Sequence, residues 1–424
     1  MVGHGWYNSR VSESRRILLV AARYPWPPTD GYRSRVSNVA LALAEVGQVD
    51  VVALSGPGSP EPVDPPSERI TPFIVEESPP PPMLARLRKF LVDGRPSRVG
   101  LDKFVDARPL ITTLVADHRY DLVWLSLLDT WDGVADLVPA PVICDLDNLE
   151  NFNARSRRAL RPVWPEGGVV ARGRVAARWV FGQVLDRINE PRWARRQRLA
   201  ADGCEHVVVC SPLDVVRSGC PNALCVPNGY ERSVDPPVRR SDLGGSPVLA
   251  FVGLMSYGPN TDGARWFARE VLPLVQRQIP DVTLRIIGRG TESVSDLAGV
   301  RGVDVVGAVD DMEVALRDVD IEVIPLRFGA GTRLKAVEAF ANRLPVVSTA
   351  IGVEGLDVSH GREVLIAEDP AALAAAVVEL CGDPGTRQRL ADNAEQLYES
   401  HYRWSAIRET VAEVVRGVVD GSDR

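Results

Sequence analysis

The sequence is poor in several features that would assign a class of protein at once. Only three of its 424 residues are lysine (Lys89, Lys103 and Lys335), so arginine carries nearly all of the positive charge. Acidic residues outnumber basic residues by 56 to 49, and the net charge of −7 provides no basic field that would attract nucleic acid. No apolar stretch approaches the roughly 20 residues that span a bilayer. These absences predict a protein without a transmembrane segment whose partners are small molecules.

The six cysteines form no pattern that indicates a disulfide framework or a zinc site. They are scattered along the chain, with no CxxC pair and no histidine at zinc-ligand spacing. Arginines precede the apolar run at residues 17–22, but six apolar residues are too few for the hydrophobic region of a signal peptide. We therefore expect reduced thiols in a cytoplasmic protein, and a first buried strand at residues 17–22.

Short apolar runs alternate with longer helical patterns along the chain, which is typical of parallel sheets built from βαβ units. The rhythm restarts after a turn-rich stretch at residues 226–247. The pattern predicts an α/β protein with two Rossmann-like, doubly wound domains, at residues 1–228 and 246–400, joined by a linker at 229–245. The expected strands are residues 17–22, 49–54, 122–125, 142–144, 206–210, 248–252, 283–287, 303–306, 321–324, 346–348 and 364–366.

Two segments of the first half have an unusual composition. Residues 56–82 contain ten prolines, which lack backbone donors, and are expected to form a surface loop or an extended connection. Residues 155–198 contain twelve arginines against three acidic residues and are predicted to form basic amphipathic helices. These helices are either solvated elements near the interdomain cleft or a surface for an anionic or lipid-linked acceptor, with peripheral membrane contact.

A glycine-rich stretch, "GAGTRLKAVEAFANRLPVVST" (residues 329–349), carries the strongest chemical signal. Backbone amides in a loop without side chains approach an anion closely, and the following helix directs its positive end to the same place. Thr332 is expected to be the N-cap of a helix over residues 333–341, on which Lys335 and Glu338 share one face. Cations here suit a pyrophosphate, and a carboxylate one turn deeper suits sugar hydroxyls. The alternative is a turn, a cap and a surface Lys–Glu pair with a purely structural role.

Motifs in both halves resemble the retaining nucleotide-sugar glycosyltransferases of the GT-B fold, the family called glycosyl transferases group 1. The resemblance covers most of the chain in the right order. It implies two Rossmann-like domains that face each other across a cleft, and a C-terminal helix at residues 401–424 that returns to the N-terminal domain. The resembling stretches are "ILLVAARYPWPPTDGYRSRVSNVALALAEVGQVDVVAL" (17–54), "VVVCSPLD" (207–214), "FVGLMSYGPNTDGARWFAREVLPLV" (251–275), "LRIIGRG" (284–290) and "IEVIPLRFGAGTRLKAVEAFANRLPVVSTAIGVEGL" (321–356).

The resemblance also implies roles for individual residues. A glutamate on the helix after the glycine-rich loop binds the nucleotide ribose in this family, and Glu338 occupies that position. The residues implied in donor binding are Gly253, Gly288, Arg289, Gly329, Ala330, Gly331, Thr332, Arg333, Lys335, Glu338, Glu354 and Gly355. Those implied in the transfer step are Asp30, Gly31, Arg333 and Lys335. Those expected to face the acceptor are Tyr32, Arg33, Asp145, Asp147 and Asn148.

Three departures from the family pattern concern the transferred sugar. A second glutamate precedes the ribose glutamate by eight positions in many members, but this chain has Ala330 there. The Arg and Lys that often follow the first strand of the second domain are absent from residues 253–260, and the usual His is absent from residues 142–152. The two aspartates in "CDLD" (144–147) are separated by one residue, as in the DxD metal-nucleotide motif of another glycosyltransferase fold. The GT-B resemblance implies instead that cations and amides stabilise the phosphates, so we expect no metal.

These observations predict a metal-independent enzyme that transfers a hexosyl group from a UDP-, GDP- or dTDP-sugar with retention of configuration. No covalently bound cofactor is expected. The acceptor is a natural product or a cell-envelope glycan or lipid-linked intermediate, and the protein is expected to be cytoplasmic or membrane-peripheral. Three alternatives remain open: coupling of a nucleotide-linked cyclitol, epimerisation of a nucleotide sugar, and nucleotide-sugar binding without catalysis.

Overall fold

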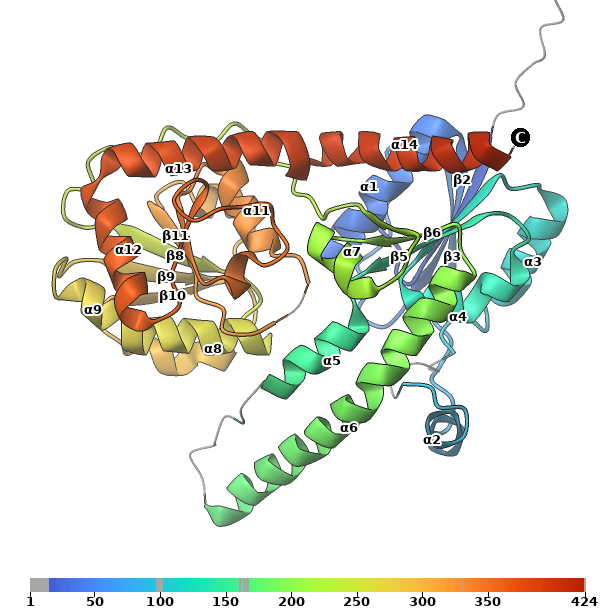
Figure 1. Ribbon diagram of the computed structural model, residues 1–424, viewed down its shortest axis with the longest axis horizontal. Helices are drawn as coiled ribbons and strands as arrows, with labels where there is room; N and C mark the ends of the chain where they lie inside the picture. Colours follow the sequence, from blue (N-terminus) through green and yellow to red (C-terminus); the bar gives the residue numbers. More distant parts are fainter. Residues whose placement is uncertain (1–14, 97–101, 160–161, 163–167, 330, 423–424) are drawn as a thin grey trace, which may run out of the picture.

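The computed structural model describes residues 15–96, 102–159, 162, 168–329 and 331–422, and contains two parallel sheets (Figure 1). The N-terminal sheet has the order β3-β2-β1-β4-β5-β6-β7, and the C-terminal sheet has the order β10-β9-β8-β11-β12-β13. Each order reverses beside the first strand of its sheet, which is the doubly wound arrangement. The predicted fold class is therefore confirmed. The strands are β1 (Arg16–Ala21), β2 (Gln48–Ser55), β3 (Ile70–Glu76), β4 (Leu122–Ser126), β5 (Val142–Asp147), β6 (His206–Val209), β7 (Ala223–Cys225), β8 (Val248–Val252), β9 (Thr283–Ile287), β10 (Val303–Gly307), β11 (Ile321–Ile324), β12 (Val346–Ser348) and β13 (Val364–Ile366).

Helices cover both faces of the two sheets, as parallel sheets require. Three segments, η1 (Ala135–Leu137), η3 (Thr291–Leu297) and η4 (Ile351–Val353), are 3₁₀ turns. Two more, η2 (Phe267–Val271) and η5 (Tyr398–Tyr402), are π-helical turns inside longer helices. The α-helices are α1 (Gly31–Val46), α2 (Met83–Leu91), α3 (Arg108–Asp117), α4 (Leu128–Val134), α5 (Glu150–Ala159), α6 (Val169–Asp202), α7 (Pro212–Ser218), α8 (Gly258–Trp266), α9 (Leu272–Gln276), α10 (Met312–Ala315), α11 (Leu334–Ala341), α12 (Pro370–Gly382), α13 (Pro384–Leu397) and α14 (Trp404–Ser422).

The central strand β1 shows why this sequence forms a sheet that is buried on both sides. Ile17 and Leu19 belong to one apolar cluster, whereas Leu18 and Val20 belong to a second cluster. Successive side chains of a strand point to opposite faces, so the continuous apolar run supplies both clusters at once.

The last helix, α14, returns from the C-terminal sheet to the N-terminal one (Figure 1). Trp404, Ile407, Val411 and Val415 recur every three or four residues and are buried in the cluster that contains α1 and β1. The chain crosses near Tyr230, whose amide donates to the carbonyl of Tyr402 at 3.0 Å. The same C-terminal segment therefore packs on both halves of the molecule.

One expectation about secondary structure is wrong, because part of the proline-rich segment is a strand. Residues 70–76 form β3, which pairs with β2 in parallel along its whole length. β3 lies at the edge of the sheet, where a strand tolerates Pro72 because one side of its backbone needs no partner. The short edge strand β7 was also not expected from the sequence.

The arginine-rich region forms two helices that lie side by side. α5 and α6 project from the N-terminal sheet on the side away from α14, with α2 beside the C-terminal part of α6 (Figure 1). The expected helices are present at residues 155–159 and 169–198, and residues 160–161 and 163–167 lie outside the described part of the chain. Within the part that the structure describes, no helix combines the length and the apolar character needed to cross a membrane.

Candidate functional site

The candidate site lies where the N-termini of α1 and α11 approach each other from the two halves of the molecule. A side chain added at Gly31, the first residue of α1, would place its Cβ 3.0 Å from Cδ1 of Leu334, the first residue of α11. The positive ends of both helix dipoles and their free backbone amides therefore point into one region. Such a region attracts a multiply charged anion such as a diphosphate.

The structure corrects the expected start of the helix after the glycine-rich loop. Arg333, not Thr332, occupies the N-cap position of α11, and its side chain makes no capping hydrogen bond. The Thr332 hydroxyl lies 3.4 Å from Nδ2 of Asn228 in the N-terminal half. Thr332 therefore contributes to the contact between the halves, and the α11 amides are left for a ligand.

Lys335 lies in the first turn of α11 and reaches the end of β8. Its Nζ donates to Oδ1 of Asn260 at 2.6 Å and lies 4.4 Å from the centre of the Phe251 ring. A Cβ at Gly253 would be 3.0 Å from the same Nζ. Burial lowers the pKa of Lys335 to about 7, against the effect of the carboxylate of Glu322. The half-buried ammonium is thus held beside the β8 turn, between the Asn260 amide and the Phe251 ring.

Two carboxyl groups lie behind this lysine. Burial raises the pKa of Glu338 to about 7, and the nearby Lys335 opposes the shift. Glu322, on β11, is completely buried, and neither carboxyl oxygen has a hydrogen-bond partner among the described residues. Burial, followed by the charge of Glu338, raises the pKa of Glu322 well above its ordinary value. Lys335 and Glu338 are therefore not the exposed ion pair of the alternative interpretation.

Arg333 supplies the second cation of the loop. Its side chain is 4% exposed, its Nε donates to the carbonyl of Ile351 at 2.8 Å, and its guanidinium lies beside Gly329. Burial lowers the pKa of Arg333, and Glu354 opposes this effect. The residue that replaces the second family glutamate, Ala330, lies outside the described part of the chain.

The turns after β8 and β9 border the same region. A side chain at Gly288 would overlap the carbonyl of Gly253, so the close approach of these turns requires glycine at position 288. The next residue, Arg289, is exposed and donates to the carbonyl of Thr29 in the other half at 3.2 Å. The beginning of α1 is thereby connected to the C-terminal sheet.

Asp30 and Arg33 stabilise the beginning of α1 from within the N-terminal half. Asp30 caps the helix by accepting from the Arg33 amide at 3.0 Å, and Arg33 Nη1 donates to Asp30 at 2.5 Å. Burial opposes ionisation of Asp30, but the Arg33 amide and the charge of Arg23 outweigh it and lower the pKa of Asp30. Arg33 is 6% exposed, which places it in the support of the site.

The other residues expected to face an acceptor fall into two groups. The Tyr32 hydroxyl accepts from the Ala22 amide at 2.9 Å, and burial raises the pKa of Tyr32 to about 12. Asp145 is 1% exposed and forms two hydrogen bonds of 2.8 Å with Arg35. Tyr32 and Asp145 therefore have buried partners inside the N-terminal half.

Asp147 and Asn148 lie instead against the glycine-rich loop. Asp147 accepts from Asn228 at 2.8 Å and from Asn148 at 3.0 Å. A side chain at Gly331 would overlap Oδ1 of Asn148, and Ser156 of α5 donates to the carbonyl of Gly329 at 3.2 Å. The N-terminal half thus positions the loop that precedes α11.

Glu354 and Gly355 also face the N-terminal half. Glu354 forms an ion pair with Arg217 of α7, and a Cβ at Gly355 would be 3.1 Å from Cβ of Ser211. Together with Phe152 and Gly331, these residues line a small cavity between the halves. In this structure the Glu354 carboxylate is engaged across the interface.

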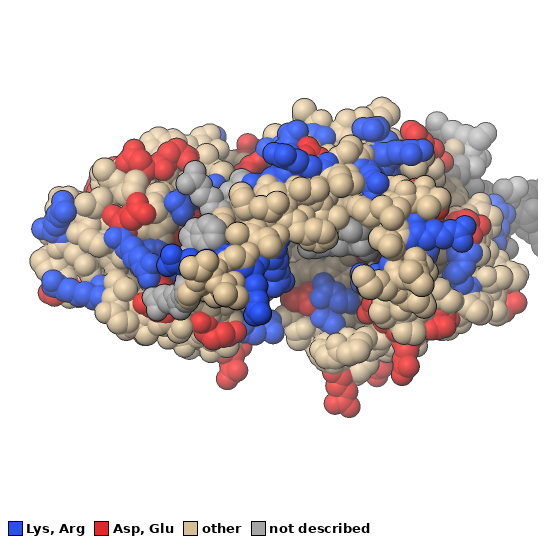
Figure 2. All heavy atoms as spheres, turned by 90° about the horizontal axis from the view of Figure 1, so that it is seen from below, with Lys and Arg blue, Asp and Glu red and all other residues tan. Residues whose placement is uncertain are grey.

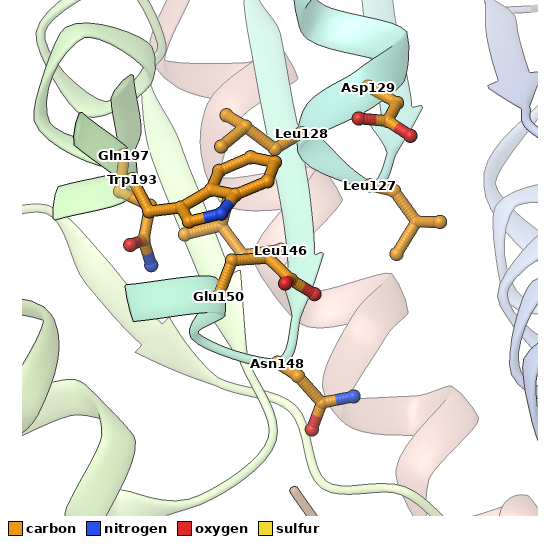
Figure 3. Close-up of a pocket in the computed structure, with 8 residues that line it drawn as sticks. All are labelled: Leu127, Leu128, Asp129, Leu146, Asn148, Glu150, Trp193 and Gln197. Atoms are coloured by element: carbon orange, nitrogen blue, oxygen red, sulfur yellow. The ribbon is translucent and has the colours of Figure 1, made fainter. Parts of the chain in front are cut away.

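A larger pocket opens at the ends of β4 and β5 in the N-terminal half and encloses about 640 Å³ of empty space, part of it open to solvent (Figure 3). Trp193 and Gln197, both 3% exposed, reach it from α6. The Gln197 Oε1 has no hydrogen-bond partner among the described residues. Burial raises the pKa of Asp129 at the rim. The lining residues are Leu127, Leu128, Asp129, Leu146, Asn148, Glu150, Trp193 and Gln197.

Sequence reasoning missed Asn260, Glu322 and the residues of α6 that line this pocket. A carboxylate inside the apolar strand "IEVI" was a signal that could have indicated Glu322. No local sequence feature indicates Trp193 or Gln197, because only the packing of α6 in the folded chain brings them to the ends of β4 and β5. Within the described residues, no group of three or more His, Cys, Asp or Glu side chains is arranged to hold a metal ion.

The fold combines two parallel sheets, and helix N-termini from both halves meet between them. Residues 246–383 match the family model "Glycosyl transferases group 1". An uncharacterized 44.6 kDa protein in the cps region of Klebsiella pneumoniae is 29% identical over 170 residues, or 38% of this chain and 44% of that protein. Glycogen synthase of Mycobacterium tuberculosis is 28% identical over 247 residues, or 56% of this chain and 58% of that protein. The chain spans about half the length of these curated relatives.

Solved structures show the same fold over nearly the whole chain. Sucrose-phosphate synthase from Thermosynechococcus elongatus has a TM-score of 0.66 at 19% identity, over 96% of this chain and 100% of that one. Anabaena HepE in complex with UDP and glucose has a TM-score of 0.58 at 14% identity, over 94% and 98%. At these identities the likeness concerns the fold. The match to the glycosyl transferases group 1 family lies in residues 246–383, and the two halves of the chain form the GT-B fold.

Proposed function

We propose that this protein transfers a hexosyl group from a nucleotide-diphosphate sugar to an acceptor hydroxyl, with retention of configuration at the anomeric carbon. The observation that carries the proposal is the meeting of two helix N-termini with the buried Arg333 and half-buried Lys335. In the reaction, the bond between the anomeric carbon and the diphosphate oxygen breaks with its electron pair. A bond to the acceptor oxygen forms, and the proton of the acceptor hydroxyl passes to the oxygen of the leaving diphosphate.

The leaving diphosphate gains negative charge as this bond breaks. Fixed amides of α11 and α1 and the cations Arg333 and Lys335 would stabilise that charge without reorganisation. Asp30 and Gly31 would hold the beginning of α1 in place, with Asp30 as its cap. Because these groups supply positive charge where a metal would otherwise act, we propose a metal-independent reaction.

The nucleotide would lie along the C-terminal half. Gly253, Gly288 and Arg289 border the α11 terminus, and Glu338 lies one turn deeper, where an ionised carboxylate accepts hydrogen bonds from ribose hydroxyls. UDP, GDP and dTDP remain the candidate nucleotides, and the relative with UDP and glucose supports the first. In this proposal residues 246–400 bind the donor, residues 229–245 are the linker, and residues 401–424 connect back.

The pocket of Figure 3 is the proposed acceptor site within residues 1–228. An indole face next to carboxylate and amide groups suits a polyhydroxylated ring, because the ring has apolar C–H faces and hydroxyls at its edge. Figure 3 shows Trp193 between Leu128 and Leu146, with Asp129 and Asn148 at opposite ends. The candidate acceptors are a natural product and a cell-envelope glycan, of which the cps-region relative favours the second.

A donor screen tests the proposal. The purified chain is incubated with UDP-, GDP- and dTDP-sugars, and its melting temperature is measured with each. We expect one nucleotide class to stabilise the protein. Glu338→Ala should remove most of this stabilisation, whereas Glu379→Ala, an exposed control on α12, should keep it.

Nucleotide release and product stereochemistry separate the alternatives. Donor-dependent nucleotide release with an acceptor, and a product of retained anomeric configuration, support transfer. An altered sugar without an acceptor would identify an epimerase, and stabilisation without any turnover would identify a binding protein. Turnover only with a nucleotide-linked cyclitol would show that the transferred group is a cyclitol and not a hexosyl group.

A further inference from the structure

We propose that α2 and the N-terminal half of α6 form one docking surface for an anionic lipid bilayer. The surface comprises residues 83–92 and 169–188. It lies outside the candidate donor site, and its test does not depend on the proposed transferase activity.

Helix α2 separates its apolar and basic side chains although it buries none of them against the protein. Met83, Leu87 and Leu91 recur every fourth residue, and Leu84 lies beside them on the same face. Met83 is 82% exposed and Leu84 is 81% exposed. The helix contains two arginines and one lysine and no acidic residue. An apolar helix face that packs on no other part of the protein indicates a surface that another molecule or a membrane covers.

The projecting half of α6 also exposes apolar side chains. Val170, Phe181, Val184 and Ile188 follow helical spacing of eleven, three and four residues, and so lie on one face. All four are exposed, Phe181 by 67%. The opposite side of α6 packs on α5, where Asp186 pairs with Arg157 at 2.7 Å. The apolar face is therefore the side that no other described element covers.

A specific contact joins the two helices into one surface. Arg192 of α6 donates to the carbonyls of Phe90 and Arg95, at 2.9 and 3.2 Å, and its guanidinium lies 4.3 Å from the centre of the Phe90 ring. Both elements project on the side away from α14 (Figure 1). From below, a band of uncharged side chains is flanked by Lys and Arg on this face (Figure 2).

The positive charge of this surface favours an anionic partner. Residues 169–185 contain Arg172, Arg174 and Arg178, all exposed, and no acidic residue, although the whole chain has a net charge of −7. A symmetric dimer through this face would bring two cationic surfaces together, which is unfavourable. An anionic bilayer instead accepts the apolar side chains at its interface and attracts the flanking arginines.

The same helix connects this surface with the pocket. Trp193 lies twelve residues after Phe181, which corresponds to about 18 Å along a helix axis. If the pocket is the acceptor site, a lipid-anchored acceptor would meet it beside the membrane. This last step rests on the proposed function, whereas bilayer binding does not.

Vesicle co-sedimentation of the full chain tests the inference. Wild-type protein should bind vesicles of phosphatidylcholine with phosphatidylglycerol, bind phosphatidylcholine alone weakly, and dissociate as salt is added. The double variants Leu84→Glu with Leu87→Glu and Phe181→Glu with Val184→Glu should each reduce the partition coefficient at least about tenfold. These positions are exposed, so a melting temperature near that of the wild type is expected.

Matched control variants test whether vesicle binding depends on this surface or on exposed apolar residues anywhere on the protein. Val216 and Val238 are 80% and 98% exposed and lie outside the surface, so Val216→Glu with Val238→Glu should bind as the wild type does. The inference is overturned by wild-type protein that ignores the anionic vesicles, or by surface variants that bind like the control. A dimer in light scattering that only the surface variants abolish would also overturn it in favour of a second copy.

Discussion

The proposed donor side and the proposed acceptor side of the molecule differ in how the chain builds them. On the proposed donor side, the loop, both cations and the carboxylate proposed to bind the ribose come from ten consecutive residues, 329–338, next to the turns after β8 and β9. On the acceptor side, the pocket combines the ends of β4 and β5 with side chains of α6 that follow about 45 residues later in the sequence. A local site can be inferred from a motif, whereas a distributed site becomes visible only when the fold has brought its parts together.

Removing the deep cation of the donor side should have the largest effect. Lys335→Ala deletes a charge that is proposed to stabilise the leaving diphosphate, so we expect turnover to fall by about 10²- to 10³-fold. Steady-state kinetics with the cognate donor measure this. Arg301→Ala removes an exposed arginine of the same half and should leave turnover within about twofold. Equal losses in the two variants would contradict a specific role of Lys335.

The pH dependence of donor binding should report the two half-buried groups of the donor side, Lys335 and Glu338. In the proposed function, binding requires a protonated Lys335 and an ionised Glu338, and both have a pKa of about 7 in the free protein. Affinity should therefore be highest near neutrality and fall on both sides, approaching tenfold per pH unit. Calorimetric titration across pH measures it. Lys335→Ala should abolish the alkaline fall, and Glu338→Ala the acidic fall; an unchanged profile in either variant would exclude that group.

The acceptor side should respond to changes that leave the donor side untouched. Gln197→Met removes the pocket-facing amide but keeps the volume, so the KM for the acceptor should rise about tenfold because one hydrogen bond to a hydroxyl is lost. Donor-induced stabilisation should be unchanged. A weakened response to the donor would show that the pocket and the donor site are not separate.

The particular elements show what the sequence could and could not predict. Strands such as Val248–Val252 and Thr283–Ile287 were predicted to the residue, because buried parallel strands are short apolar runs with clear ends. Strand β3 was not, since prolines normally exclude a strand and only an edge position permits one. On the candidate site, the motif indicated Lys335 and Glu338, but the partner Asn260 and the neighbour Glu322 come from separate elements. Thr332 was given the wrong role because local capping preference was outweighed by contact with Asn228.

We expect Glu322 to lower the stability of the folded protein and to bind no ligand. Its pKa is raised in the folded state, so the unfolded chain ionises first and stability falls as pH rises above about 4.5, until the folded-state pKa is reached. Glu322→Leu should therefore gain about 1–2 kcal/mol at pH 8 and less at pH 5. Urea unfolding at both pH values measures this, with the exposed Glu379→Leu as the control. A loss of stability in Glu322→Leu at pH 8 would mean that the carboxylate has a partner it needs.

The smallest expected effect is that of changing Thr332, which contacts Asn228 in the other half of the molecule. A helix cap elsewhere, Asp369, serves as the comparison. Asp369 is a true N-cap, since it accepts from the Ala372 amide at 2.9 Å at the start of α12, and Asp369→Ala should cost about 1 kcal/mol of stability. Thr332 caps nothing and only meets Asn228 at 3.4 Å, so Thr332→Ala should cost less than about 0.5 kcal/mol. Denaturant midpoints of both variants measure the difference. Equal losses would restore Thr332 as a helix cap, whereas the expected inequality assigns it to the interface through which the N-terminal half positions the donor loop.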